Sequence, residues 1–247
     1  MNPILDISKL SGGYLPGKPI IRNLDIRVGE GEMVGLIGLN GAGKSTTIKH
    51  ILGLLKPQEG SVRIGNKTLE EDPLGYRASY SFVPESPELY DELTIEEHLE
   101  LTAMAYGVSD AEYQARSQRL MDEFQMQAKR TSFPSQLSKG MKQKVMIMNA
   151  FLVKPSLYVI DEPFLGLDPL AMRSLLDMMD EFRKEGASFL ICSHILATIE
   201  KYCDRFVVLH HGEILAQGTL LELRQQTGLP EATLDELFYH LIRGNPA

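Results

Sequence analysis

The sequence predicts an α/β fold with a mixed, largely parallel sheet, an N-terminal antiparallel β region and an inserted α-helical subdomain. Short apolar runs at residues 33–37, 157–160 and 188–192 each fit a buried strand, and each precedes a helical pattern. Strands that alternate with helices form largely parallel sheets with helices on their faces. Two charged, amphipathic helical stretches, 94–106 and 110–127, come between the first run and the second. They predict a helical subdomain inserted between the two halves of the sheet.

The first third of the chain predicts short strands and one helix. Residues 4–7 and 24–28 alternate apolar and polar side chains, as half-buried strands do. Residues 44–55 place four apolar side chains on one face of a helix. Further strands are expected at 61–64 and 79–83.

In the remaining two thirds of the chain, expected helices and strands continue to follow one another. Thr94 followed by Glu97 is a capping-box pattern at the start of a helix. His211 and Gly212 lie between two apolar runs and predict a hairpin turn. The other expected elements are helices at 139–153, 170–184 and 195–202, a strand at 205–209 and a helical tail at 219–243. We therefore expect a main domain of residues 1–218, with a helical subdomain of about 86–153 inserted, and a C-terminal helical extension of residues 219–247.

Charge and composition exclude several classes of function. The formal net charge is −8, Trp is absent, and no stripe of Lys and Arg alternates with aromatic residues, which argues against nucleic acid as a partner. No uncharged apolar stretch approaches about 18 residues, so no membrane span is expected. Cys192 and Cys203 lack metal-ligand spacing and are expected to be reduced core residues.

Residues 38–46 form a candidate phosphate loop, because residues 38–45 fit the pattern G-x-x-x-x-G-K-[ST] between an expected strand and an expected helix. Glycines let backbone N–H groups turn inward around an anion, and the helix start adds its dipole. Lys44 would supply a charge to the β- and γ-phosphates, and Ser45 a hydroxyl to Mg²⁺. The alternative is a glycine-rich turn without a ligand. The residues predicted to bind the nucleotide here are Gly38, Asn40, Gly41, Ala42, Gly43, Lys44, Ser45 and Thr46.

Two carboxylates narrow the choice between a GTPase, a kinase and an ATPase. Residues 157–160 are apolar and end at Asp161 and Glu162. Asp161 can hold Mg²⁺, directly or through water, and Glu162 can polarise the water that attacks the γ-phosphate. An isolated Asp-Glu pair is more often a solvated turn, but a phosphate loop earlier in the chain favours the catalytic interpretation. Lys44, Glu162 and His194 are the predicted catalytic residues.

Residues 137–143, Leu-Ser-Lys-Gly-Met-Lys-Gln, look like the signature motif of ABC ATPases. The resemblance implies a P-loop NTPase-type ABC ATPase core in which Ser138 and Gly140 donate hydrogen bonds to the γ-phosphate held by a second copy. A helix start with Ser138 as its N-cap would favour an anion. Lys139 and Met141 depart from the commoner motif, and Lys139 would add a cation near the phosphate.

Three further features follow the order of the same family. Residues 166–168, Gly-Leu-Asp, are similar to its D-loop, which runs along the dimer interface. His194, thirty-two residues after Glu162, matches the switch histidine, which the resemblance implies contacts the γ-phosphate. Tyr14, thirty residues before Lys44, matches the aromatic that stacks on adenine. Taken alone, His194 could be structural and Tyr14 a surface loop residue.

Glu85 is the main departure from the family pattern. The family carries a glutamine in this frame, which contacts Mg²⁺ and water through a neutral oxygen. A carboxylate is a stronger ligand for Mg²⁺, but it also repels the γ-phosphate. At about 4 Å and an effective dielectric of about 20, each opposed effect is roughly 4 kcal/mol, so the net sign stays open. We expect Glu85, Ser45 and Asp161 to surround the metal; the alternative is an isosteric replacement with little effect.

The resemblance implies a function for the whole chain. It implies an ATPase subunit that binds ATP and Mg²⁺, pairs with a second copy, and works with an integral membrane permease subunit at the cytoplasmic face of the membrane. Residues 82–85, 137–144 and 161–168 look most like the ATPase subunit of Ecs-type transporters of Firmicutes, which implies export. Leu89 and Tyr90 are candidate contacts with the permease, or core residues of the helical subdomain. The rival is a soluble ABC ATPase, such as an Fe–S assembly type.

Overall fold

The computed structural model describes residues 3–244. Its main sheet has six strands in the order β5-β6-β7-β3-β8-β9, and all neighbours are parallel except β8 and β9. This mixed, largely parallel sheet confirms the predicted fold class. The strands are β3 (Met33–Gly38), β5 (Tyr80–Val83), β6 (Leu157–Asp161), β7 (Ser188–Cys192), β8 (Arg205–His210) and β9 (Glu213–Gly218).

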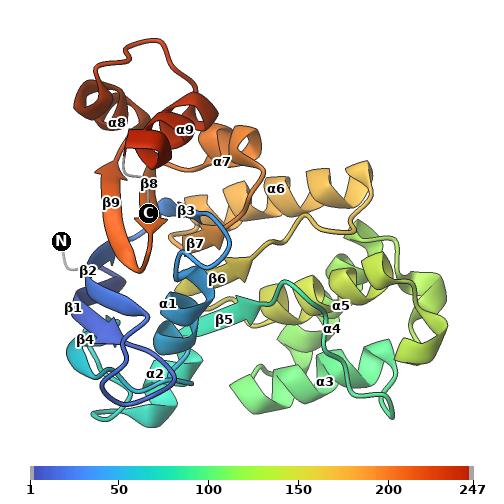
Figure 1. Ribbon diagram of the computed structural model, residues 1–247. Helices are drawn as coiled ribbons and strands as arrows, with labels where there is room; N and C mark the ends of the chain where they lie inside the picture. The colour runs from blue at the N-terminus through green and yellow to red at the C-terminus, as the bar shows by residue number, and fades with distance from the viewer. Residues whose placement is uncertain (1–2, 245–247) are drawn as a thin grey trace.

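A second sheet of three antiparallel strands in the order β2-β1-β4 faces the main sheet. The helix α1 (Lys44–Ile51) lies between the two sheets, as Figure 1 shows. The strands of this second sheet are β1 (Leu5–Gly12), β2 (Ile21–Val28) and β4 (Glu59–Ile64), and the short helix α2 (Pro73–Ala78) follows β4 in the chain. Residues of both sheets and of α1 share one buried apolar cluster. This packing fixes the start of α1 against the main sheet.

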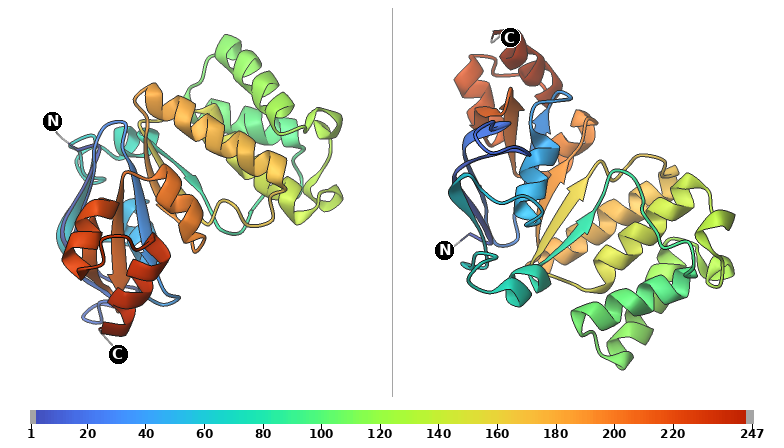
Figure 2. Two further views of the ribbon diagram at one scale, coloured as in Figure 1. Left: turned by 90° about the horizontal axis from the view of Figure 1, so that it is seen from above. Right: turned by 60° about the horizontal axis from the view of Figure 1, so that its bottom comes forward.

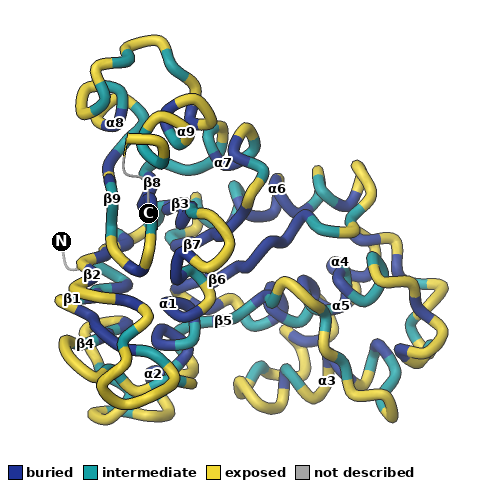
Figure 3. The backbone as a smooth tube through the Cα atoms, in the orientation of Figure 1, coloured by how far each residue is buried: buried dark blue, intermediate teal, exposed yellow. Residues whose placement is uncertain are grey.

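Alternate side chains of β6 enter two different cores. Leu157 and Val159 pack in the cluster under the antiparallel sheet, whereas Tyr158 and Ile160 pack against helices on the opposite face. A strand that is apolar on both faces lies in the middle of layered structure. Figure 3 shows β6 and β7 as buried segments in the middle of the molecule. The end of β6, where Asp161 lies, is therefore rigidly held.

The inserted helices lie to one side of the molecule, away from the antiparallel sheet (Figure 2). They are α3 (Ile95–Tyr106), α4 (Asp110–Glu123) and α5 (Lys139–Leu152), and they share a core with α6 (Pro169–Lys184). The expected capping box of Thr94 and Glu97 is formed at the start of α3. Ser138 is the N-cap of α5, and its Oγ accepts a hydrogen bond from the N–H of Met141 at 3.3 Å.

The C-terminal part forms a third apolar cluster at the β8–β9 edge of the main sheet. Its helices are α7 (Leu196–Tyr202), α8 (Leu220–Thr227) and α9 (Leu234–Gly244). Buried residues of α7, α8 and α9 pack there against Ile37, Phe206 and Val208 of the main sheet. Residues 245–247 of the expected extension lie outside the described part of the chain.

Several expected boundaries were wrong, each for a local reason. The helix expected at 44–55 ends at Ile51, and Gly53 then adopts a left-handed φ of 71°. The helix expected at 110–127 ends at Glu123, and Gln125 has a φ of 57°. The tail is two helices rather than one, because Gly228 ends α8 in the left-handed conformation. The helix α2 and two 3₁₀ turns, Gln127–Lys129 and Pro134–Gln136, were not expected.

Within residues 3–244, no helix has both the length and the apolar character that a bilayer crossing requires. Cys192 and Cys203 are free thiols, and burial raises the pKa of each. Cys192 is a buried core residue as expected, whereas Cys203 is only partly buried.

Candidate nucleotide site

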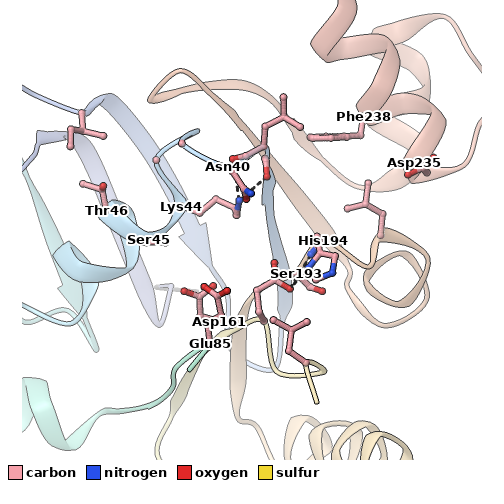
Figure 4. A pocket seen from close by; sticks show the side chains of 18 residues that line it. Asn40, Lys44, Ser45, Thr46, Glu85, Asp161, Ser193, His194, Asp235 and Phe238 are labelled. Atoms are coloured by element: carbon pink, nitrogen blue, oxygen red, sulfur yellow. Dashed lines mark hydrogen bonds and ion pairs between the residues drawn. The ribbon is translucent and has the colours of Figure 1, made fainter. Parts of the chain in front are cut away.

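A cavity of about 1030 Å³ opens at the carboxyl ends of β3, β6 and β7. Ligand sites in open α/β sheets lie at this edge. The phosphate loop, the two carboxylates at the end of β6 and His194 all border it (Figure 4). The lining residues are Ile20, Gly38, Leu39, Asn40, Gly41, Gly43, Lys44, Ser45, Thr46, Glu85, Asp161, Glu162, Leu165, Ser193, His194, Leu196, Asp235 and Phe238.

The glycines of the phosphate loop are required by its geometry. Gly41 and Gly43 have φ values of 82° and 111°, which residues with a side chain rarely adopt. A Cβ at Gly38 would lie 2.6 Å from the carbonyl oxygen of Leu209. The loop therefore packs tightly against β8 while its tip turns toward the cavity.

The start of α1 is suited to an anion. Its N-cap is Gly43, no side chain caps its first N–H groups, and its first turn has no acidic residue. Lys44 Nζ donates hydrogen bonds to the carbonyl oxygens of Gly38 and Leu39, at 2.7 and 3.2 Å. Uncapped amides and a lysine next to them form a positively polarised cradle. Such a cradle can hold phosphates.

Asp161 and Glu85 lie side by side in the cavity that Ser45 also lines (Figure 4). Burial raises the pKa of Asp161 from 3.8 to about 6, the charges of Glu162 and Glu85 add to this, and Lys44 opposes it. Asp161 is 8 % exposed, whereas Glu85 is exposed. The carboxylates thus form a region of excess negative charge that a divalent cation would relieve.

Glu162 and His194 are joined by two hydrogen bonds. The Oε2 of Glu162 accepts from the backbone N–H of His194 at 3.1 Å and lies 2.7 Å from its Nδ1. Glu162 is 8 % exposed, whereas the side chain of His194 is 62 % exposed. Glu162 has a left-handed φ of 48°, a conformation with a cost of order 1 kcal/mol for a residue with a side chain. The turn directs its carboxylate toward His194.

Two predicted residues, Ser138 and Gly140, lie outside this cavity. Ser138 is exposed at the start of α5. A Cβ at Gly140 would lie 2.3 Å from the carbonyl oxygen of Gly166, so the signature segment (137–143) touches the D-loop segment (166–168) of the same chain. Lys144 and Asp168 connect the same two regions with an ion pair at 2.8 Å.

Tyr14 and Ala42 also do not line the cavity. The side chain of Ala42 is buried within the loop. The hydroxyl of Tyr14 accepts a hydrogen bond from Lys49 at 3.1 Å, and this bond lowers the pKa of Tyr14. Tyr14 is 52 % exposed, Lys49 Nζ lies over its ring at 4.9 Å from the centroid, and its contact with adenine stays a prediction.

Several lining residues were not predicted. Leu39, Leu165 and Ser193 adjoin predicted elements and motifs, so their neighbours in the sequence could have indicated them, whereas Ile20 adjoins none. Asp235 and Phe238 come from α9, and nothing in their sequence surroundings indicates a contact with the phosphate loop. Tertiary packing alone brings them there.

The chain resembles proteins of one family throughout its length. Residues 21–165 match the pattern of the ABC transporter family. The ABC-type transporter ATP-binding protein EcsA of Bacillus subtilis (strain 168) is 54 % identical over 240 residues, which cover 97 % of each chain. This relative matches the Ecs-type resemblance of the sequence.

Solved structures agree with this assignment. A structure described as the ATP-binding subunit of an ABC transporter superimposes with a TM-score of 0.94 at 54 % identity, over 96 % of this chain and 99 % of the other. A dimeric ATP-binding cassette in a post-hydrolysis state, bound to ADP and phosphate, superimposes with a TM-score of 0.78 at 25 % identity, over 87 % of this chain and 98 % of the other. The chain therefore belongs to the ABC transporter family, as an ATP-binding, ATP-hydrolysing subunit.

Proposed function

We propose that two copies of this chain close head-to-tail over two ATP molecules and that their ATPase cycle drives transport through a membrane partner. One observation carries this proposal. The cavity contains the phosphate loop, Glu162 and His194, whereas Ser138 and Gly140 of the signature segment lie outside it in the same chain. The cavity is therefore half of a site, and a second copy would supply the other half. The ADP-bound relative is described as dimeric, which supports this arrangement.

The residues around the cavity fit Mg²⁺. Ser45, Asp161 and Glu85 offer the oxygen ligands that this ion prefers, and burial, together with the charges of Glu162 and Glu85, raises the pKa of Asp161. Among residues 3–244, no group of three or more acidic, His or Cys side chains forms a metal site by itself. Ser45, Asp161 and Glu85 would hold the ion, and when bound with the nucleotide it would supply positive charge to offset that of the transferred phosphoryl group.

The other roles follow from position and charge. Lys44 would exchange its loop carbonyls for the β- and γ-phosphates. Glu162 would accept a proton from the attacking water, and its two bonds from His194 hold the carboxylate in place for this. Ser138 and Gly140 of the second copy would contact the γ-phosphate, and Tyr14 would stack on adenine.

A permease subunit is the proposed membrane partner, with this chain at the cytoplasmic face of the membrane. EcsA is named as a transporter protein and supports this part, and export is the direction we propose. The helical subdomain, residues 86–153, would dock the permease. Tyr90 is 63 % exposed and is a candidate contact, whereas Leu89 packs partly buried against the helical core. Purification in detergent with a tagged chain tests this: an integral membrane protein should come down with it, and recovery of a soluble Fe–S assembly partner instead would contradict the transporter proposal.

Glu162→Gln tests the catalytic half of the proposal. The amide keeps the size of the carboxylate but is far too weak a base, so turnover should fall by at least about a hundredfold while ATP still binds. Because the closed dimer reopens only after hydrolysis, the variant should elute as a dimer with ATP and as a monomer without it. ATPase rates and size-exclusion chromatography measure both effects. Near-wild-type turnover would refute Glu162 as the base.

A further inference from the structure

Helix α9 contributes to the ATP cavity from the far end of the chain. Asp235 and Phe238 line it together with the phosphate loop and His194, and Figure 4 shows both on the opposite side of the cavity from Thr46. Neither residue belongs to a motif, and the proposed chemistry uses neither. The position of α9 therefore needs its own explanation.

Helix α9 packs against α7, which begins two residues after His194. Leu234 and Leu237 of α9 are completely buried in the cluster that also contains Leu196 and Ile199 of α7. Phe238 packs partly buried against the same cluster. A carboxylate oxygen of Glu200, on α7, accepts a hydrogen bond from the backbone N–H of Leu234 at 2.7 Å. Apolar packing thus joins the two helices, and the Glu200 side chain of α7 also bonds the N-terminus of α9.

The start of α9 is not a second phosphate cradle. The N–H of Leu234 donates to Glu200, and the N–H of Glu236 donates to Oγ1 of Thr233 at 3.3 Å. Asp235 adds a negative charge on the cavity side, which repels phosphate. Direct binding of the nucleotide by this helix end is therefore unfavourable. Its effect on the site must act through the residues it packs against.

The segment that α9 supports also packs, through Leu196 and Ile199, against the buried cluster of the main sheet. The side chain of His194 is 62 % exposed although it bonds Glu162. The helix α7 has seven residues, and no side chain caps its N-terminus at Ile195. A short helix gains most of its stability from packing, and here the packing includes α9.

We propose that α9 positions His194, because Phe238 and the Glu200–Leu234 bond hold α7 at the edge of the cavity. This rests on the proposed role of the Glu162–His194 pair. The positioning residues are Phe238 and Glu200; neither contacts the reacting atoms. Loosening α7 moves the histidine relative to the γ-phosphate, which lowers the rate of hydrolysis more than the affinity for ATP.

Phe238→Ala tests the proposal, with Tyr239→Ala as matched control. Tyr239 is the next residue of α9, is 55 % exposed, and stacks with Arg243 of its own helix. Misplacement of a catalytic group by a fraction of an ångström costs roughly tenfold in rate, so kcat of Phe238→Ala should fall about tenfold with little change in KM. Tyr239→Ala should match the wild type. Equal losses in the two variants would contradict the proposal. Thermal melting should show both variants folded at the assay temperature.

A double-mutant cycle separates positioning of His194 from any other effect of α9. In a His194→Ala background, Phe238→Ala should cause no further loss, since the group that it positions is absent. Glu200→Ala should behave as Phe238→Ala, and Glu200→Gln, which keeps an acceptor oxygen for the Leu234 N–H, should recover most of the rate. A tenfold loss in both backgrounds would overturn the role of α9. Full turnover of Glu162→Gln would instead contradict the proposed function itself.

Discussion

The negative charge of Asp161 is unfavourable in this structure, because the carboxylate is buried beside two others. Burial, reinforced by Glu162 and Glu85, raises the pKa of Asp161 from 3.8 to about 6. The folded protein therefore binds this proton more tightly than the unfolded chain does. The stability that the protonated form contributes is fully present below about pH 4 and is lost as the pH rises through 6. At neutral pH the ionised carboxylate of Asp161 therefore lowers the free energy of unfolding of the protein.

Asp161→Asn should therefore stabilise the nucleotide-free protein while abolishing ATP hydrolysis. A pKa shift of about two units corresponds to an upper limit of about 3 kcal/mol at pH 7.5. Urea unfolding in EDTA should show a higher free energy of unfolding for the variant at pH 7.5, and the difference should shrink toward pH 5, where the wild-type carboxyl is largely protonated. A pH-independent difference would show that the charge of Asp161 is not its cause.

The sequence predicted the residues of this cavity that lie in motifs, because the spacing of a motif along a strand and the turn after it fixes local geometry. Lys44 and Ser45 follow β3, Asp161 ends β6, and all three line one cavity. Phe238 was missed, since its position depends on how α9 packs against α7. The pKa of Asp161 could not be foreseen either, because it depends on burial and on carboxylates that follow two different strands.

At the scale of elements, the start of α5 and the start of α6 form one unit. Gly140 touches the backbone of Gly166, and Lys144 pairs with Asp168, whose side chain also caps α6 by accepting from the N–H of Ala171. The segment proposed to reach the second nucleotide is thus joined to the segment that follows Glu162. A displacement of one moves the other.

Gly140→Ala should break this contact. The new Cβ would meet the Gly166 carbonyl oxygen at 2.3 Å, far inside a normal contact, so the D-loop segment must shift. Overpacking of this kind costs about 1–3 kcal/mol, which exceeds the gain in helix propensity of up to about 1 kcal/mol. The melting temperature and the ATPase rate should both fall. Gly244→Ala is the control, because its Cβ would meet nothing within 4 Å. A wild-type melting temperature for Gly140→Ala would show that the loop yields freely.

The elements themselves were predicted unevenly, for a physical reason. Strands such as β6 and β7 are continuously apolar because both faces are buried, and this signal is local. The ends of α1 and α4 depend on single residues in left-handed conformations, which the apolar pattern does not reveal. The sequence of α9 is clearly amphipathic, but this pattern does not indicate which surface of the protein the apolar face of α9 covers.

At the scale of the whole molecule, a half-site in each copy predicts complementation between two inactive variants. Lys44→Ala damages the phosphate-loop half and Ser138→Arg the signature half. A mixed dimer of these two keeps one intact site, formed by the loop of the Ser138→Arg copy and the signature segment of the Lys44→Ala copy. If the two sites act independently, an equal mixture should recover about a quarter of wild-type turnover, since half of the dimers are mixed and each has one site of two.

The matched control mixes Lys44→Ala with Glu162→Gln. Both lesions then lie in the same half of the site, so neither site of the mixed dimer is intact. ATPase rates across a series of mixing ratios distinguish the cases. Recovery of turnover in this second mixture, or none in the first, would contradict a site shared between copies.

Lys44 already has partners in the empty loop, the carbonyl oxygens of Gly38 and Leu39. These hydrogen bonds hold the loop in shape without an anion. A ligand therefore enters a preformed site, and the loop does not have to order around it. Binding becomes an exchange of oxygen acceptors around the ammonium group, with little ordering of the backbone left to oppose it. A compact polyanion that fits the loop, such as pyrophosphate, should then compete with ATP for it.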